Sequence, residues 1–245
     1  MYCRAVALGG FLYCFLSAFQ SFGQQATTSD SSLYSGSIRQ LYHIYFNQIG
    51  QSAELYNGAE YIRNGQKANG FPFFESNDQL PGDVSCQGIM YHDLRLQYDL
   101  VQDELITNNY QHSALIRLPK EKVDSFSIAG HHFLRLVVAK TNGALPDNGY
   151  YEQLTSNEMP VFAKRIKKFV IPNGYEDPEY VQYNTFYLKL NNSFYPVGGK
   201  NSLLDLLKDK KDQLKKFIRV NKLNFKKRPE EAIVRTTSYY ARLKS

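Results

Sequence analysis

The residues best suited to acid–base chemistry are the carboxylates Asp93, Asp99, Asp103 and Glu104, which lie in one short stretch of the chain. Glycoside hydrolases use two carboxyl groups about 5–10 Å apart. Asp93 and Asp99 share one face of a predicted strand, where their spacing in the sequence separates them by roughly 20 Å. This distance excludes them as an acid–base pair. Asp99 and Asp103 can meet only across a turn, so we favour the alternative that they supply turn hydrogen bonds and solvated charge.

The histidines and cysteines follow no spacing that is typical of a metal or nucleophile site. Adjacent His131 and His132 would point to opposite faces of a strand, so they cannot bind one metal ion together. For His92 we expect a buried, hydrogen-bonded imidazole. The sequence contains no H-E-x-x-H, C-x-x-C, calcium-loop or G-x-S-x-G pattern. We therefore predict no catalytic residue, no metal site and no cofactor.

Positive charge is concentrated near the C-terminal end of the chain. Residues 200–245 contain 14 basic and 5 acidic side chains, whereas residues 24–199 carry a net charge of −4. Attraction between exposed charges is screened over about 8 Å at physiological salt, so binding through them must weaken as salt rises. We predict such binding to an anionic surface, and the alternative is a helix face that is merely solvated. The residues predicted to bind are Lys208, Lys211, Lys215, Lys216 and Arg219.

One long strand is the clearest element that positions the carboxylates. Over residues 89–100, apolar and polar side chains alternate, with Leu94, Leu96 and Tyr98 at even positions and Arg95, Gln97 and Asp99 at odd positions. Alternation of this kind predicts a buried even-numbered face and a solvated odd-numbered face, the usual condition of an antiparallel sheet.

Two hairpins are expected further along the chain. Residues 149–154 and 160–170 form the first, and residues 185–190 and 193–197 form the second. The second hairpin turns at Asn191-Asn192, because asparagine tolerates the positive φ of a tight turn.

Helices are expected at both ends of this sheet. The spacing of apolar residues predicts one helix over 35–50, a second over 202–220 with Ser202 as its N-cap, and a third from Pro229 to Leu243. The sequence therefore predicts an α+β fold, in which a curved antiparallel sheet over roughly 52–198 has an N-terminal helix and C-terminal helices.

The first residues have the layout of a cleavable secretory signal. Arg4 precedes an apolar run, Ala5–Phe19, and Ser21 and Gly23 form a small-x-small cleavage site. The run is short of the roughly 20 residues that a bilayer span needs, although a retained membrane anchor is the alternative. We expect cleavage after Gly23 and export to the periplasm or the exterior. Cys86 is then the only cysteine left, so no internal disulfide can form, and we expect its side chain to be buried.

Four segments of the mature chain resemble a known group of sequences. They are the run G-x-x-Y-x-D-x-x-L-x-Y-D-x-x-x-D-x-L over 88–105, F-x-I-x-G-x-x-F over 126–133, Y-Y-x-x-L…K-R-x-K over 150–167, and F-Y-L at 186–188. Together they resemble an uncharacterised family of exported proteins from Gram-negative bacteria. The resemblance implies a periplasmic or cell-envelope location, and it implies no activity and no catalytic residues.

We expect four parts in the chain: a signal peptide at 1–23, a disordered lead-in at 24–34, a helix and sheet at 35–198, and a basic helical segment of the same domain at 199–245. The predicted function is that of an exported, non-enzymatic binding or assembly protein of the cell envelope. The alternative is a hydrolase of an envelope polymer. The expected partner is an envelope protein, a glycan or an anionic lipid. Nucleic acid is not expected, because the chain is exported and lacks a nucleic-acid-binding signature, and after cleavage we expect no integral membrane protein.

Overall fold

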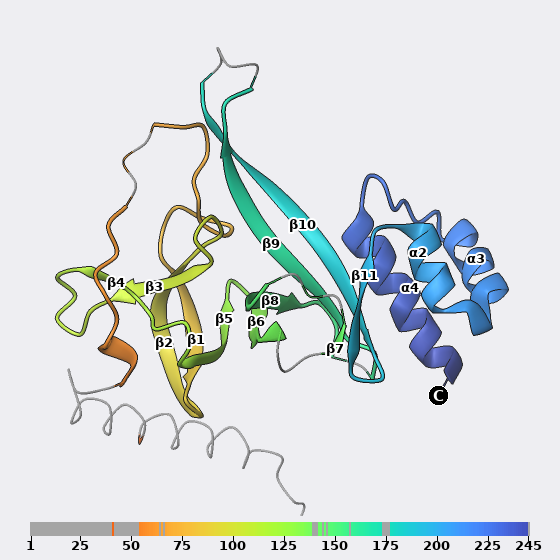
Figure 1. Ribbon diagram of the computed structural model, residues 1–245, viewed down its shortest axis with the longest axis horizontal. Helices are drawn as coiled ribbons and strands as arrows, with labels where there is room; N and C mark the ends of the chain where they lie inside the picture. Colours follow the sequence, from red (N-terminus) through yellow and green to blue (C-terminus); the bar gives the residue numbers. More distant parts are fainter. Residues whose placement is uncertain are drawn as a thin grey trace, which may run out of the picture. The chain divides into compact units, whose positions relative to one another are not determined.

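The computed structural model describes Leu41 and residues 54–63, 65, 67–138, 142–143, 145, 147–156, 158–172 and 177–244 (Figure 1). All of them belong to one compact unit, residues 41–245. The predicted signal peptide and lead-in lie outside the described residues, and so does the predicted N-terminal helix apart from Leu41. In the described part of the chain, no helix has the length and apolar character needed to cross a membrane.

Eleven strands form one sheet in the described chain, in the order β4-β3-β2-β1-β5-β6-β8-β9-β10-β11-β7. The strands are β1 (Leu80–Cys86), β2 (Ile89–Asp99), β3 (Glu104–Asn108), β4 (Leu115–Arg117), β5 (Val123–Ile128), β6 (His131–Leu136), β7 (Asn142–Gly143), β8 (Gly149–Gln153), β9 (Val161–Val170), β10 (Glu179–Leu190) and β11 (Ser193–Val197). All pairs of neighbours are antiparallel except β11 and β7, which are parallel. The prediction of a mainly antiparallel sheet is confirmed.

Both predicted hairpins are present. β8 pairs with β9, and β10 pairs with β11 from Phe186↔Val197 to Leu190↔Ser193. Asn191 and Asn192 turn the second hairpin with φ values of 46° and 64°. These angles lie in the left-handed region that asparagine tolerates better than most residues do.

The predicted long strand contains a β-bulge, which the alternation did not reveal. Asp83 of β1 stands opposite two residues of β2, His92 and Asp93, and the backbone of Asp93 has a φ of 57°. One extra residue exchanges the two faces of a strand. On the N-terminal side of the bulge, Tyr91 is therefore buried and Met90 is exposed, so the prediction of a buried even-numbered face is wrong there. It is confirmed after the bulge, at positions such as Leu96.

The face of β2 that was predicted to be solvated is covered near its end. Gln97 and Asp99 are each 1% exposed, whereas Arg95 is exposed as expected. The segment before β1 causes this burial, because the Tyr61 hydroxyl donates to Asp99 and the amide of Gln97 donates to the Asn77 carbonyl. The strand is thus buried on both faces where it carries these polar residues.

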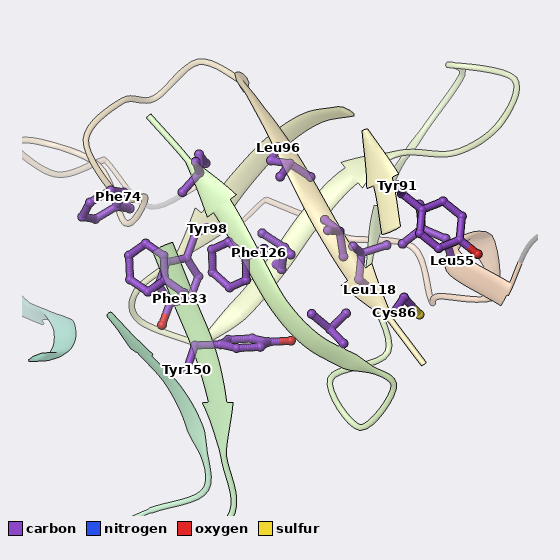
Figure 2. Close-up of a cluster of buried hydrophobic side chains, with 14 of the residues drawn as sticks. Leu55, Phe74, Cys86, Tyr91, Leu96, Tyr98, Leu118, Phe126, Phe133 and Tyr150 are labelled. Atoms are coloured by element: carbon purple, nitrogen blue, oxygen red, sulfur yellow. The ribbon is translucent and has the colours of Figure 1, made fainter. Parts of the chain in front are cut away.

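The main core lies between the first strands and contains a group of aromatic rings (Figure 2). Phe126 and Phe133 stack with their centroids 4.8 Å apart, and the ring of Tyr98 meets both edge to face. Such pairs contribute about 0.5–1.5 kcal/mol beyond the burial of their area. Cys86 is 1% exposed in this core, which confirms the prediction of a buried side chain.

The C-terminal helices are α2 (Lys200–Leu206), α3 (Lys211–Val220) and α4 (Pro229–Lys244), with short 3-10 turns at Glu54–Tyr56 (η2) and Lys208–Lys210 (η5). A second core, which includes Val161 of β9 and Leu203 of α2, packs these helices against β9, β10 and β11 (Figure 1). The prediction of C-terminal helices is therefore confirmed, and the last one ends within a residue of its predicted end.

The single helix predicted over 202–220 is wrong, because the chain breaks it into α2 and α3. Leu207 leaves the helical region with φ −106° and ψ 41°, and η5 follows. In one continuous helix Lys210 would project onto the apolar stripe, whereas in the structure it belongs to η5, between the two helices. Ser202 is the third residue of α2 rather than its N-cap, and its hydroxyl accepts a hydrogen bond from the Gly199 amide at 3.0 Å.

Candidate anion-binding groove

The α3 helix carries a row of basic side chains next to a buried apolar stripe. Lys211, Lys215 and Arg219 follow one another at intervals of four residues, so they stand in a row along the helix. Leu214 and Ile218 form a stripe beside this row and are buried, at 0% and 4% exposure. Burial of this apolar stripe therefore fixes the rotation of α3 about its axis, and with it the side to which the basic row points.

A groove of about 900 Å³ runs along this row, between α3, the start of α2 and the loop after α3. Its floor includes the apolar side chains of Leu204, Ile218 and Leu223. Six cations and one carboxylate also line it: Lys200, Lys211, Lys215, Lys216, Arg219, Lys222 and Asp212. The groove is thus strongly cationic.

Most of this charge is not neutralised by the protein. Lys211 pairs with Asp205 at 2.6 Å between Nζ and Oδ1, and Lys215 lies 3.7 Å from an oxygen of Asp212. Among the described residues, no carboxylate forms an ion pair with the other four cations, Lys200, Lys216, Arg219 and Lys222. Several unpaired cations around one concave surface raise the local concentration of anions.

A second hollow, of about 320 Å³, continues the groove past the end of α3. The two hollows share Lys222, Leu223 and Asn224. The second one adds Lys227 and Arg228, and Arg228 lies 3.5 Å from a carboxylate oxygen of Glu231. The cationic surface therefore extends beyond α3 into the loop before α4.

The α4 helix supports the groove from behind. The rings of Phe217 on α3 and Tyr239 on α4 stack with their centroids 4.1 Å apart. Lys244 of α4 binds Asp209 of η5 at 2.9 Å, and this hydrogen bond lowers the pKa of the Asp209 carboxyl. Tyr240 donates to the same carboxylate at 2.9 Å. These contacts fix α3 and η5 on α4, so the cations project from a supported surface.

The groove brings together four of the five residues predicted to bind. Lys211, Lys215, Lys216 and Arg219 line it, whereas Lys208 lies in η5 and lines neither hollow. Sequence reasoning missed Lys200 and Lys222, on the other sides of the groove. In the sequence they are recognisable only as members of the basic segment. Their places in the groove depend on the break between α2 and α3 and on the turn after α3.

The carboxylates near β2 have separate partners. Asp99 accepts hydrogen bonds from the Tyr61 hydroxyl and from the backbone amides of Val101 and Gln102. This confirms that it supplies turn hydrogen bonds, but Asp99 is 1% exposed, so the expectation of a solvated charge is wrong there.

Asp103 is partly buried between two lysine ammonium groups. It accepts a hydrogen bond from the Tyr98 hydroxyl at 2.5 Å, and it pairs with Lys120 at 2.5 Å and Lys164 at 2.9 Å. Burial lowers the pKa of Lys164, and the charge of Asp103 opposes this shift. A Cβ atom at Gly149 would lie 2.2 Å from an oxygen of Asp103 and 2.6 Å from the Lys164 ammonium, so a larger residue there would displace these two groups. Two ammonium groups and one hydroxyl thus balance the charge of the Asp103 carboxylate.

Two of the histidines, His92 and His131, lie next to carboxylates. The Nδ1 atom of His92 lies 3.2 Å from Asp83, and the Nδ1 atom of His131 lies 2.5 Å from Glu152. Glu152 also binds Arg165, which reaches Glu230 of α4 at 2.9 Å. In the described part of the chain, no three His, Cys, Asp or Glu side chains come together so as to hold a metal ion.

No known protein family, curated protein or solved structure matches this chain. The resemblance to exported envelope proteins therefore stays a prediction from the sequence motifs.

Proposed function

We propose that this chain is an exported, non-enzymatic binding protein of the cell envelope that holds an anionic ligand in the groove of its C-terminal helices. One observation carries the proposal: Lys200, Lys216, Arg219 and Lys222 converge on one hollow, and no described carboxylate neutralises them. Holding such charges together costs free energy through mutual repulsion. A bound anion removes that cost, and this favours binding over a merely solvated face.

The size and composition of the groove favour a ligand with several negative groups. A water molecule takes up about 30 Å³ of liquid, so a groove of about 900 Å³ has room for far more than a single ion. Arginine and lysine both bind phosphate well, arginine through two parallel hydrogen bonds and lysine as a point charge. We therefore propose a phosphate-bearing ligand, either the headgroups of an anionic lipid or a phosphate-rich polymer of the envelope.

The matched test compares two double variants that remove the same charge from the same segment. The groove variant, Lys216→Gln with Arg219→Gln, removes two unpaired cations from the groove. The control variant, Lys208→Gln with Lys226→Gln, removes two exposed cations that lie outside it. Each cation near an anionic surface contributes about 1 kcal/mol, so the groove variant should bind roughly 30-fold more weakly. The control variant should bind nearly as well as the wild type.

Two probes distinguish the sources of phosphate. Co-sedimentation with phosphatidylglycerol vesicles tests the lipid, and calorimetry with inorganic tripolyphosphate tests the polymer. Binding of either probe must weaken as salt rises, because the attraction is screened. Equal loss of binding in both double variants would show that the net charge of the segment matters and the groove does not. That result would contradict the proposal.

Export rests on the sequence, on Arg4, the apolar run Ala5–Phe19 and the pair Ser21 and Gly23. N-terminal sequencing of the protein recovered from the envelope should begin at Gln24. A chain that keeps Met1 and sediments with membranes would instead indicate a retained anchor.

A further inference from the structure

A short part of the β10 edge lies open between two main-chain partners. β10 pairs with β9 from Glu179↔Val170 to Leu188↔Val161, but its pairing with β11 begins only at Phe186. At the other end, the Tyr180 amide donates to the Asn69 carbonyl at 3.0 Å. Between these points, over residues 182–185, no strand in the described part of the chain lies on this side of β10.

The alternation of backbone directions shows which groups face the opening. The Lys189 amide donates to the Pro160 carbonyl on the β9 side, so odd-numbered residues of β10 point their backbone groups toward β9. Even-numbered residues point away, as Tyr180 does toward Asn69. The amides and carbonyls of Gln182 and Asn184 therefore face outward, and no described backbone group bonds to them on that side.

This open edge is short, but it carries no charge, proline or bulge that would hinder strand pairing. Natural proteins protect exposed edges with lysine, proline, bulges or very short strands. Residues 182–185 read Gln-Tyr-Asn-Thr, without charge or proline, and the register of β9 and β10 contains no shift there. Tyr183 is 45% exposed, and an exposed aromatic side chain is an apolar contact for a strand laid beside it.

We propose that this opening binds a short extended segment of a partner polypeptide as an added strand. The space from Tyr180 to Phe186 is roughly 20 Å long, which admits about five residues of strand. A second copy of β10 does not fit, because its own β11 would run into Asn69 and β11 of the first copy. The bound segment must therefore belong to a chain that approaches the β10 edge and turns away from it within about five residues. This inference is independent of the anion-binding groove, because it involves no residue of α2, α3 or α4.

The neighbouring side chains define the chemistry of the partner segment. Tyr183 favours an aromatic or β-branched residue beside it. The Lys168 ammonium lies 5.6 Å from the centroid of the Tyr183 ring, so it can also pair with a carboxylate carried by the incoming strand. We therefore expect an apolar residue with an acidic residue two positions away, since those two share one face of a strand.

A library of displayed random heptapeptides, selected on the purified protein, supplies the probe. The best peptide is then measured against two variants of one position. Asn184→Pro removes the outward amide and places a ring where the partner carbonyl would bind, and it leaves the bonds to β9 intact. Asn184→Ala is the matched control, because it removes the same side chain and keeps the amide.

Asn184→Pro should bind the peptide about tenfold or more weakly, the effect of one lost hydrogen bond together with the steric block, while Asn184→Ala should bind like the wild type. Amide hydrogen exchange is a second readout that needs no variant. The selected peptide should slow exchange at Gln182 and Asn184 and leave the amide of Tyr183, already bonded to β9, unchanged. The proposal is overturned if no peptide is selected, if the selected peptides bind all three proteins equally, or if the protected amides lie elsewhere.

Discussion

Two tyrosines of the main core meet edge to face, but their hydroxyl groups have opposite environments. The rings of Tyr98 and Tyr150 lie 5.8 Å apart at an angle of 87° (Figure 2). The Tyr98 hydroxyl donates to Asp103 at 2.5 Å, whereas the buried Tyr150 hydroxyl has no hydrogen-bond partner among the described residues. Replacing each tyrosine by phenylalanine makes the same chemical change in these two settings.

The two variants should change stability in opposite directions. A hydrogen bond to a charged group contributes about 1.5–3 kcal/mol, so Tyr98→Phe should lower the free energy of unfolding by that amount. A buried hydroxyl without a partner costs about 1–3 kcal/mol of desolvation, so Tyr150→Phe should raise the free energy of unfolding by roughly 1 kcal/mol. Tyr183→Phe is the control, because this exposed ring should give a change within about 0.5 kcal/mol.

Urea unfolding followed by circular dichroism measures these differences, and thermal melts check them. In a chain of this size, 1 kcal/mol shifts the melting temperature by about 2–4 °C. If Tyr150→Phe destabilises the protein as much as Tyr98→Phe does, the hydroxyl of Tyr150 has a partner and the reasoning from its burial is refuted.

Three further predictions concern the sheet and its buried charges. Gly82→Ala should destabilise the protein by about 1–3 kcal/mol in urea unfolding, because the new Cβ would lie 2.2 Å from the Ser127 carbonyl oxygen, whereas Gly65→Ala, with nothing within 4 Å, should be nearly neutral. Asp103→Asn should cost about 3–5 kcal/mol by leaving the Lys164 ammonium without its counter-charge, and adding Lys164→Met should restore most of that stability in a double-mutant cycle; full additivity of the two changes would contradict it. Burial raises the pKa of Tyr61, Tyr98 and Tyr151 above the ordinary value of 10.0, so their contribution to stability is complete below pH 10 and is lost as the pH rises through the folded-state values. The tyrosinate absorbance should therefore rise in two stages, the second coinciding with alkaline unfolding, and a single stage before unfolding would show that these hydroxyls are accessible.

Local signals in the sequence predicted the local elements well. Asn191-Asn192 identified a hairpin turn because asparagine tolerates positive φ, and Pro229 with the acidic residues after it identified the start of α4. Each of these features depends on neighbours in the sequence, so no knowledge of the distant chain was needed.

The features that sequence reasoning missed depend on distant parts of the chain. The bulge at Asp93 is seen in the positive φ of that residue and in its pairing with β1. The alternation of side chains in the sequence reveals neither. Burial of Gln97 and Asp99 requires the segment before β1 to fold over β2. Three of the predicted binding residues, Lys211, Lys215 and Arg219, follow one helical face, and this spacing brings them to the groove.

Lys200 and Lys222 join that groove only because the chain folds back after α2 and again after α3. The turn after α3 includes Lys222 itself, whose φ is 51°. Sequence spacing measures distance along one element, and it cannot measure distance between elements.

The central claim is that the groove, rather than the net charge of the C-terminal segment, binds anions. A titration of the isotope-labelled protein with inorganic tripolyphosphate, followed by the chemical shifts of its backbone amides, tests this claim most directly. We expect saturable shifts centred on Lys200, Lys216, Arg219 and Lys222, which diminish as salt is added. Shifts of equal size at Lys208 and Lys226, or no shifts at low salt, would contradict it.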